Sequence, residues 1–491
     1  MNTMPKKTCF LITAALILWF AMSYPQHALA QSLVTGAPSA SQGNAGQSQT
    51  GNQQQGTEQV RTPQENTVSL SGIRAYTPGS TGEERSFLLP SLQITGNWDS
   101  NPYYQPGGSG ELYIGTGAWS LGLQRIKRRS QLNLSYAGGE IVSSRPLPSN
   151  FGTDLGKYET YHSLSFGYEY NGLRWKSTLM DQFSFLPESS FGFSGFNGLP
   201  GFGAGLGLPI SPSGTPLSNG LVANQSILTG YSRRISNVSA AEADYSFTPR
   251  TSLSMSGSYG ILQYISSGFY DTNYYGGSLG LDHLLTRRDQ LGLAYAYEYI
   301  GFAGLTQNIE IHSAQIAYGR KLTGKLSLKL SAGPMLDIIN PPIGRPVRRI
   351  YASTSDSLNY RLGRGDLHLN YIRYTSPGAG VFFGAETDRV SAGFSHRILR
   401  RYFFSLDAGY AQNKSLSGVG IIINGSTFNT VQGGATLSTS LGEYISFFMG
   451  YQVQQQSANT SVCTAGQCGR TFLRNIVTEG INWHGRPIPI H

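Results

Sequence analysis

The chain has 491 residues and a formal net charge of +9, yet only 13% of its residues are charged, while 62 are glycine and 29 are tyrosine. Soluble domains usually carry about 25% charged residues, so this composition argues against an ordinary multidomain soluble protein. The mean hydropathy of −0.21 argues equally against a bundle of membrane helices. Low charge without long apolar segments indicates alternating strands, and this length permits one large all-β body.

The first 30 residues have the pattern of a secretory signal. Lys6 and Lys7 precede an apolar segment from Cys9 to Met22, and His27–Ala30 has the small-x-small pattern of a cleavage site. A signal anchor is the alternative, but the apolar segment is shorter than the roughly 20 residues of a spanning helix. We therefore expect residues 1–30 to be a signal peptide.

Residues 31–84 are predicted to be a low-complexity periplasmic segment. From Gln31 to about Asn66 the chain consists mostly of Gln, Gly, Ser, Thr and Ala. Such a composition cannot bury enough apolar surface to fold by itself. The pattern changes at Arg85, and we expect residues 85–491 to form the folded domain.

From residue 85 onward, large apolar side chains alternate with small or polar ones. In Asp289–Phe302, DQLGLAYAYEYIGF, Leu and Tyr occupy one parity, and Gly, Ala and Glu occupy the other. A soluble sheet would place charged residues on its outer face, so the apolar face here indicates lipid and the other face a water-filled lumen. The predicted fold is all-β, a transmembrane antiparallel up-and-down β-barrel.

The predicted connections between strands alternate in length. Short ones occur at Lys127, Tyr170, Phe247, Thr286, Lys321, Leu362, Ile398 and Ser440. Longer ones, rich in Gly, Pro, Ser and Asn, occupy 144–157, 188–222, 340–347, 414–425 and 457–469. Short periplasmic turns alternating with longer external loops are typical of outer-membrane barrels, whereas a soluble all-β repeat protein has no reason for this alternation. The count predicts about 18 strands, with 16 as the alternative.

Charged residues on the small parity are candidates for the lumen wall. They are Glu169, Glu298, Lys329, His368 and Asp407. Their mixed signs favour a polar channel over a selective filter. Arginine pairs such as Arg128-Arg129 fall mostly at predicted turns, where they are either solvated strand ends or a basic rim that attracts anions.

A glycine-rich loop, Phe191 to Gly214, is the longest predicted external connection. It is either a flexible surface loop or a constriction that folds into the barrel. The constriction candidates are Phe191, Phe193, Phe196 and Phe202. Its glycines lack the strand and helix that a phosphate-binding loop requires.

The chain offers little for catalysis or metal binding. Cys463 and Cys468 are predicted to form a local disulfide after export; a metal site is the alternative, but it lacks a nearby His. Neighbouring His and Ser residues on a strand point to opposite faces, so they cannot act together as they stand. The pairs are His162-Ser163, His312-Ser313 and Ser395-His396. We expect no enzymatic activity, no metal and no cofactor.

The start of the predicted barrel carries a family resemblance. LLPSLQITGNWDSNPYY, Leu88 to Tyr104, is an alternating strand that ends in an aromatic residue, an Asp and an Asn, here Trp98, Asp99 and Asn101. It resembles the first strand and loop of the beta-barrel porin 2 type of outer-membrane protein. The resemblance implies a single barrel and an association with exopolysaccharide production.

The C-terminal sequence VTEGINWHGRPIPIH departs from that family pattern. Gly480 and Trp483 keep part of the assembly signal, but Gly485 stands where a final aromatic residue is expected, and Pro487 and Pro489 follow. We expect insertion by the barrel assembly machinery, with the register of the last strand left open.

These observations together predict a passive channel for small hydrophilic solutes in the cell outer membrane. The alternatives are an export conduit for a secreted exopolysaccharide and a structural barrel with a closed lumen. The expected partners are outer-membrane lipid and the assembly machinery; an exporter would add periplasmic polysaccharide-export components. Nucleic-acid binding is not expected, because the basic residues lie on no soluble recognition element.

Overall fold

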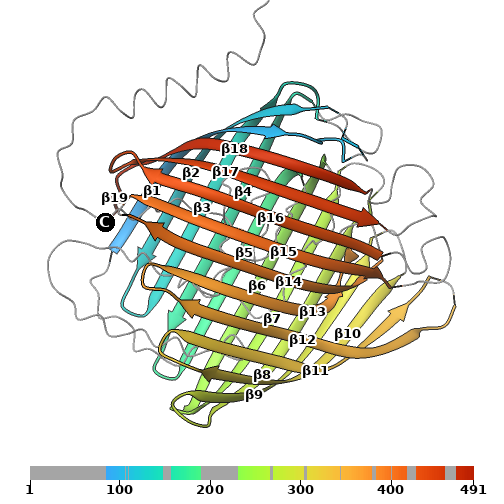
Figure 1. Ribbon diagram of the computed structural model, residues 1–491. Helices are drawn as coiled ribbons and strands as arrows, with labels where there is room; N and C mark the ends of the chain where they lie inside the picture. Colours follow the sequence, from blue (N-terminus) through green and yellow to red (C-terminus); the bar gives the residue numbers. More distant parts are fainter. Residues whose placement is uncertain are drawn as a thin grey trace, which may run out of the picture.

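A computed structural model of the chain shows one closed antiparallel β-barrel (Figure 1). The structure describes residues 85–104, 107–108, 110–147, 156–188, 231–265, 269–303, 307–342, 344–378, 383–399, 401–416, 427–458 and 471–490. The predicted signal peptide, the segment 31–84, the constriction candidates in 191–214 and the cysteines Cys463 and Cys468 lie outside these residues.

Eighteen strands make up the wall, and a two-residue strand, β19, follows them. The strands are β1 Arg85–Asp99, β2 Leu112–Ile126, β3 Ser130–Ser143, β4 Tyr158–Asn171, β5 Trp175–Glu188, β6 Tyr231–Thr248, β7 Thr251–Tyr264, β8 Thr272–Leu284, β9 Asp289–Phe302, β10 Asn308–Lys321, β11 Leu326–Asn340, β12 Val347–Arg361, β13 Gly365–Ser376, β14 Ala385–Ile398, β15 Tyr402–Ser415, β16 Thr427–Ser440, β17 Ile445–Ala458, β18 Phe472–His484 and β19 Ile488–Pro489. Each strand pairs with the next, and β1 pairs with β18. The predicted eighteen-stranded barrel is confirmed, and the sixteen-stranded alternative is wrong.

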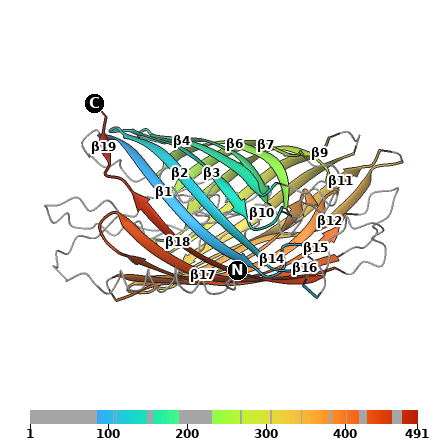
Figure 2. The ribbon, with the colours of Figure 1, turned by 90° about the horizontal axis from the view of Figure 1, so that it is seen from above.

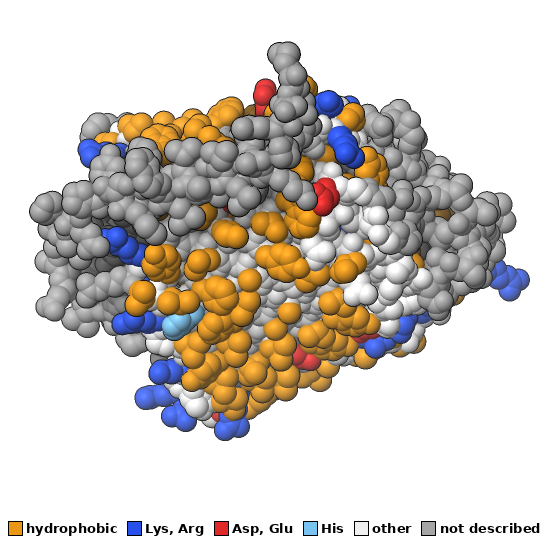
Figure 3. Space-filling view, turned by 45° about the horizontal axis from the view of Figure 1, so that its top comes forward, with side chains coloured by type: hydrophobic (Ala, Val, Ile, Leu, Met, Phe, Trp, Pro, Cys, Tyr) orange, Lys and Arg blue, Asp and Glu red, His pale blue; other side chains and the backbone are white. Residues whose placement is uncertain are grey.

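The alternation of side chains explains why these segments form a membrane wall. On β9, Leu291, Leu293 and Tyr295 point outward and are 42%, 60% and 48% exposed. Gln290 and Gly292, on the other parity, are buried inside. Figure 3 shows hydrophobic side chains over the middle of one wall, with Lys and Arg toward its edges. Such a band suits hydrocarbon, which offers no hydrogen bonds to polar side chains.

The connections divide the barrel into two ends. Every even-numbered strand up to β16 reaches the next strand through a short turn; β4, for example, ends at Asn171 and β5 begins at Trp175. The predicted short connections all fall at these turns, which define the short-turn end of the barrel. The opposite end, which we call the long-loop end, carries connections such as that from Glu188 to Tyr231. By the usual architecture of outer-membrane barrels, the short-turn end faces the periplasm.

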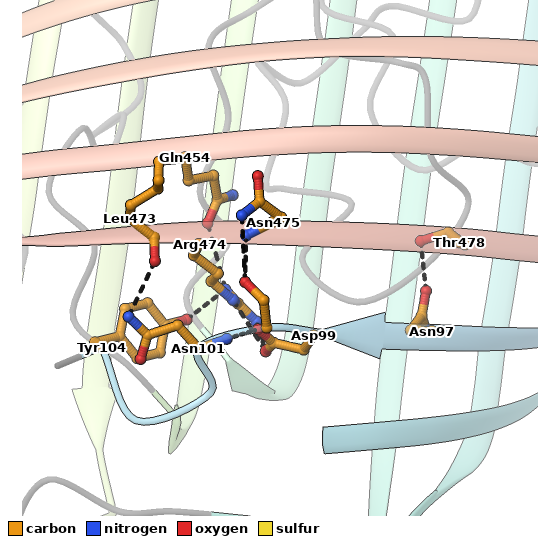
Figure 4. A network of polar contacts seen from close by, with 10 residues as sticks. Asn97, Asp99, Asn101, Tyr104, Gln454, Leu473, Arg474, Asn475 and Thr478 are labelled. Atoms are coloured by element: carbon orange, nitrogen blue, oxygen red, sulfur yellow. Dashed lines mark hydrogen bonds and ion pairs between the residues drawn. The ribbon is translucent and has the colours of Figure 1, made fainter. Parts of the chain in front are cut away.

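The barrel closes where β1 lies beside β18 (Figures 1 and 2). Arg474 of β18 points toward the first strand, and its guanidinium donates to Asp99 Oδ2 at 2.7 and 3.0 Å (Figure 4). The same guanidinium donates to the Tyr104 hydroxyl at 2.6 Å. The Arg474 and Asp99 side chains are 3% and 1% exposed. Trp98-Asp99-Asn101, singled out in the sequence, therefore lies at the closing seam.

The register of the last strand is resolved. β18 pairs with β1 up to His484, the chain then leaves the ladder, and β19 resumes pairing opposite Phe87 and Leu88. Gly480 points inward, and a Cβ there would collide with the ring of Phe448. Trp483 points outward and is 43% exposed. The C-terminal prolines thus follow the membrane strand and leave its pairing intact.

Candidate functional site in the barrel lumen

Halfway along the barrel, β7 and β12 present small inward side chains that carry hydroxyl groups. β7 turns Ser254, Ser256 and Ser258 inward, and β12 turns Ser353, Ser355 and Ser357 inward. Hydroxyls on neighbouring strands hydrogen-bond to each other, for example Ser256 with Ser278 at 2.5 Å. Small hydroxyl side chains make a thin polar wall, which leaves space for water inside a barrel of this strand number.

Opposite charges gather inside the short-turn ends of β4 to β8. Lys176 Nζ lies 3.4 Å from Glu169 Oε1, which also accepts from Asn171 Nδ2 at 2.9 Å. Lys176 is the register partner of Asp244 on β6. Asp282 of β8 acts electrostatically on Asp244 as well. Carboxylates therefore outnumber ammonium groups among these inward side chains.

The lumen candidates from the sequence all lie on the inward parity of their strands, but they do not converge. Glu169, Lys329, His368 and Asp407 lie near the short-turn ends of four strands, and Glu298 lies farther along β9. His368 has a packing role as well, because its ring occupies the space that a Cβ at Gly393 would need. The candidates thus line the circumference and do not form one binding site.

Sequence reasoning missed other inward charges. Lys176, Asp244, Asp282 and Arg389 occupy the same parity as the candidates above. The sequence did contain this information. Alternation applied to WKSTLMDQF places Lys176 inside the barrel, and alternation applied to AETDRVSAG places Arg389 inside it. Arg389 is 2% exposed and hydrogen-bonds the Tyr374 hydroxyl.

Toward the long-loop end, the inward face of β8 to β11 becomes apolar, so the expectation of a small or polar inward face fails there, whereas β1 and β18 keep polar inward residues such as Asp99 and Arg474. Ile300, Ile309 and Ile339 are 0% exposed. They belong to a cluster that also contains Met180, Val238, Ala240, Tyr274, Phe302, Ile311, Met335 and Leu416. Here inward side chains pack against one another and against loop residues, which the strand pattern alone does not reveal.

The loop between β13 and β14 reaches this cluster on the inner side of the barrel. The ring of Phe383 lies 4.1 Å from that of Tyr270 and 5.3 Å from that of Phe302 at the end of β9. Gly384 has a φ of +84°, and a Cβ there would collide with Ile309 of β10. Three strands, β10 to β12, lie between β9 and β13 in the wall, so this contact bridges that sector on the inner side of the barrel. We interpret the segment at Phe383 and Gly384 as a constriction; the role predicted for the 191–214 loop stays a prediction.

A buried polar group adjoins the constriction. Asp337 of β11 is 0% exposed, and its Oδ2 accepts from Thr375 Oγ1 at 2.6 Å. The Tyr351 hydroxyl of β12 donates to the same oxygen. These bonds tie β11, β12 and β13 together beside the apolar cluster, so they hold the base of the Phe383 loop in place.

The neighbouring His and Ser residues separate to opposite faces of the wall. His162 points outward and bonds the Tyr136 hydroxyl at 2.8 Å, and His312 likewise bonds Tyr295 at 2.8 Å. Among the described residues, no group of three or more His, Cys, Asp or Glu is placed to hold a metal ion. The part of the chain that the structure covers contains no helix long and apolar enough to cross a membrane.

Comparison with known proteins finds similarity among solved structures. No family model and no curated protein matches the chain, so the resemblance at Leu88–Tyr104 stays a prediction. The outer membrane protein OpdK of Pseudomonas aeruginosa is 9% identical, with a TM-score of 0.41 over 81% of this chain and 99% of its own. OccK7 (OpdD) of Pseudomonas aeruginosa is 12% identical, with a TM-score of 0.41 over 84% and 100%. OccAB3 of Acinetobacter baumannii is 9% identical, with a TM-score of 0.43 over 82% and 99%.

These similarities are too remote to indicate a solute or a mechanism. The location follows from the barrel itself, because eighteen strands close into a wall with an apolar outer face and with turns that alternate in length. The chain is an antiparallel β-barrel of the cell outer membrane.

Proposed function

We propose that the barrel is a passive channel for small hydrophilic solutes. The observation that carries this proposal is the hydroxyl-lined middle of the lumen, where β7 and β12 present serines inward. Such a wall exchanges hydrogen bonds with water and with polar solutes without holding either tightly.

The constriction around Phe383 limits what passes. Phe383 reaches inward from the wall to Tyr270 and Phe302, so we expect the channel to select for small size. The charges near the short-turn end have mixed signs, which supports weak selectivity for ions over a strict filter.

The test is the current through the purified protein in a planar bilayer under a salt gradient. Steady steps with a small reversal potential support the diffusion channel. Small or rare steps with a marked anion preference would favour the export conduit for an exopolysaccharide. Silence from correctly folded barrels would overturn the channel and leave the closed structural barrel.

Swelling of liposomes that contain the protein gives a second measurement. Neutral sugars of increasing size should enter at falling rates, with a cut-off set by the constriction. Equal entry of all sizes would contradict a constriction at Phe383.

A further inference from the structure

Polar side chains meet on the outer, lipid-facing side of β5 and β6. Asp181 has the same parity as the outward residues Leu179 and Phe183 of β5. Its carboxylate accepts from Ser239 Oγ at 2.5 Å and from Asn237 Nδ2 at 3.2 and 3.3 Å, both on β6. A carboxylate with these partners is unexpected on a surface that faces hydrocarbon.

The depth of Asp181 in the membrane raises the free-energy cost of placing a carboxylate on the outer face. Trp175, at the short-turn end of β5, is 48% exposed and lies against Tyr245 in an aromatic pair typical of the membrane interface. Asp181 follows Trp175 by six residues. At about 3.3 Å per residue and a tilt of about 40°, it lies about 15 Å above that interface, near the middle of a hydrocarbon layer about 25 Å thick. Lipid there offers neither donors nor water.

A strip of small outward side chains adjoins Asp181 on the side nearer the short turns. The outward neighbours toward β7 and β8 are small: Ser177, Ala241, Ala243, Gly257 and Gly277. Larger outward side chains border this strip: Phe166 is the register partner of Asp181 on β4, and Leu179, Tyr259 and Leu279 are 48%, 48% and 49% exposed. Small side chains let a second wall approach closely, as they do between membrane helices.

The hydrogen-bond acceptor and the donors lie on separate strands, so the same face on two copies of the chain can be complementary. The carboxylate belongs to β5, and the amide and hydroxyl belong to β6. A twofold axis that runs between β5 and β6 along the membrane normal places β5 of one copy opposite β6 of the other. Asp181 of each copy then faces Asn237 and Ser239 of its partner.

We propose that two copies of this chain associate side by side in the membrane through this β5–β6 face. The other outward carboxylates at comparable depth lack its features. Asp356 of β12 accepts from the backbone N–H of Ser331 at 3.1 Å and has large outward neighbours, Leu330 and Tyr371. Glu479 of β18 lies beside Gly96, with Met449 as its register partner on β17.

The first experiment measures the mass of the full-length folded protein in detergent and in lipid nanodiscs. The wild type should have the mass of two barrels. Asp181→Leu with Asn237→Leu should weaken the dimer at least about tenfold, or about 1.4 kcal/mol. Asp356→Leu is the matched control and should leave the dimer intact. Heat-modifiable migration on a gel shows that each variant is folded.

A wild type that is monomeric in both media would overturn the proposal, and a trimer would overturn the twofold arrangement. Equal loss of the dimer in Asp356→Leu would show general destabilisation and overturn the role of the face. The result does not depend on conductance, so it stands apart from the channel proposal.

The second experiment tests geometry. In a background with Cys463→Ser and Cys468→Ser, Ala241→Cys should cross-link under mild oxidation, because a disulfide needs Cα atoms within about 7 Å. Val390→Cys, also outward but on β14, should not. Cross-linking of Val390→Cys alone, or of neither variant, would contradict the proposed axis.

Discussion

The rings of Phe383 and Tyr270 lie 4.1 Å apart and join the loop after β13 to the loop after β7 on the inner side of the barrel. Neither residue belongs to a strand. Tyr270 lies just before β8 and Phe383 lies just before β14, and these two strands are far apart along the wall. The contact therefore lies inside the barrel, where we expect it to narrow the route between the two ends.

Phe383→Ala should enlarge the unitary conductance, because it removes the ring that reaches Tyr270 and Phe302. The measurement is the step size in planar bilayers at fixed salt. Phe403→Ala is the control, because Phe403 points inward at the short-turn end, where it is 44% exposed. Equal steps in the wild type and Phe383→Ala would show that the narrowest point lies elsewhere.

Lys176→Met should make the channel more selective for cations. The substitution leaves Glu169 and Asp244 without their shared positive neighbour, so the negative potential in that part of the lumen grows. The reversal potential under a KCl gradient reports this change, which should shrink near 1 M salt, where the screening length falls to about 3 Å. Lys325→Met, in an exposed turn, should have no effect. A shift toward anions would refute the predicted polarity.

Arg474→Ala should destabilise the folded barrel by about 3–5 kcal/mol, because it leaves the Asp99 carboxylate buried without its partner. Unfolding in urea, monitored by heat-modifiable migration, measures the loss. Arg320→Ala removes an exposed pair, in which Nε lies 3.6 Å from Asp289 Oδ1, and should cost less than about 1 kcal/mol. Similar losses in the free energy of unfolding for the two variants would show that the seam pair stabilises the barrel no more than an exposed pair does.

Gly480→Ala should impair closure of the barrel, because its Cβ would collide with the ring of Phe448. The yield of folded protein after dilution from urea measures this effect. Adding Phe448→Ala should restore part of the yield by removing the ring, although the backbone oxygen of Ile94 still lies 2.8 Å from the same Cβ. Gly117→Ala, where a Cβ meets nothing within 4 Å, should fold as the wild type does. If the double variant folds no better than Gly480→Ala, the ring of Phe448 is not the obstacle.

The wall of this protein could be read from its sequence because a strand pattern repeats every two residues and each turn has its own composition. DQLGLAYAYEYIGF on β9 shows both faces without any knowledge of its neighbours. The short turn at Tyr170 and the long connection after Glu188 likewise identify the two ends of the barrel.

The interior depends on contacts that no local pattern contains. Ile309 looks like an ordinary strand residue, yet it packs against Gly384 from a loop more than 70 residues away. Asp181 on β5 likewise could not be recognised as an outward acceptor until its register with Ser239 on β6 was known. The constriction and the proposed association face are therefore products of the closed barrel.

Because β1 pairs with β18 at the seam, the first and last strands each need the other to be stable in lipid. The contact between Asp99 and Arg474 joins residues 375 positions apart, so it forms only after nearly the whole barrel has been delivered to the membrane. A chain that stops before β18 would expose the unpaired N–H and C=O groups of β1 to hydrocarbon, where each costs several kcal/mol. Incomplete copies thus carry an open edge that disfavours stable insertion, and the last strand serves as a physical check that synthesis was finished.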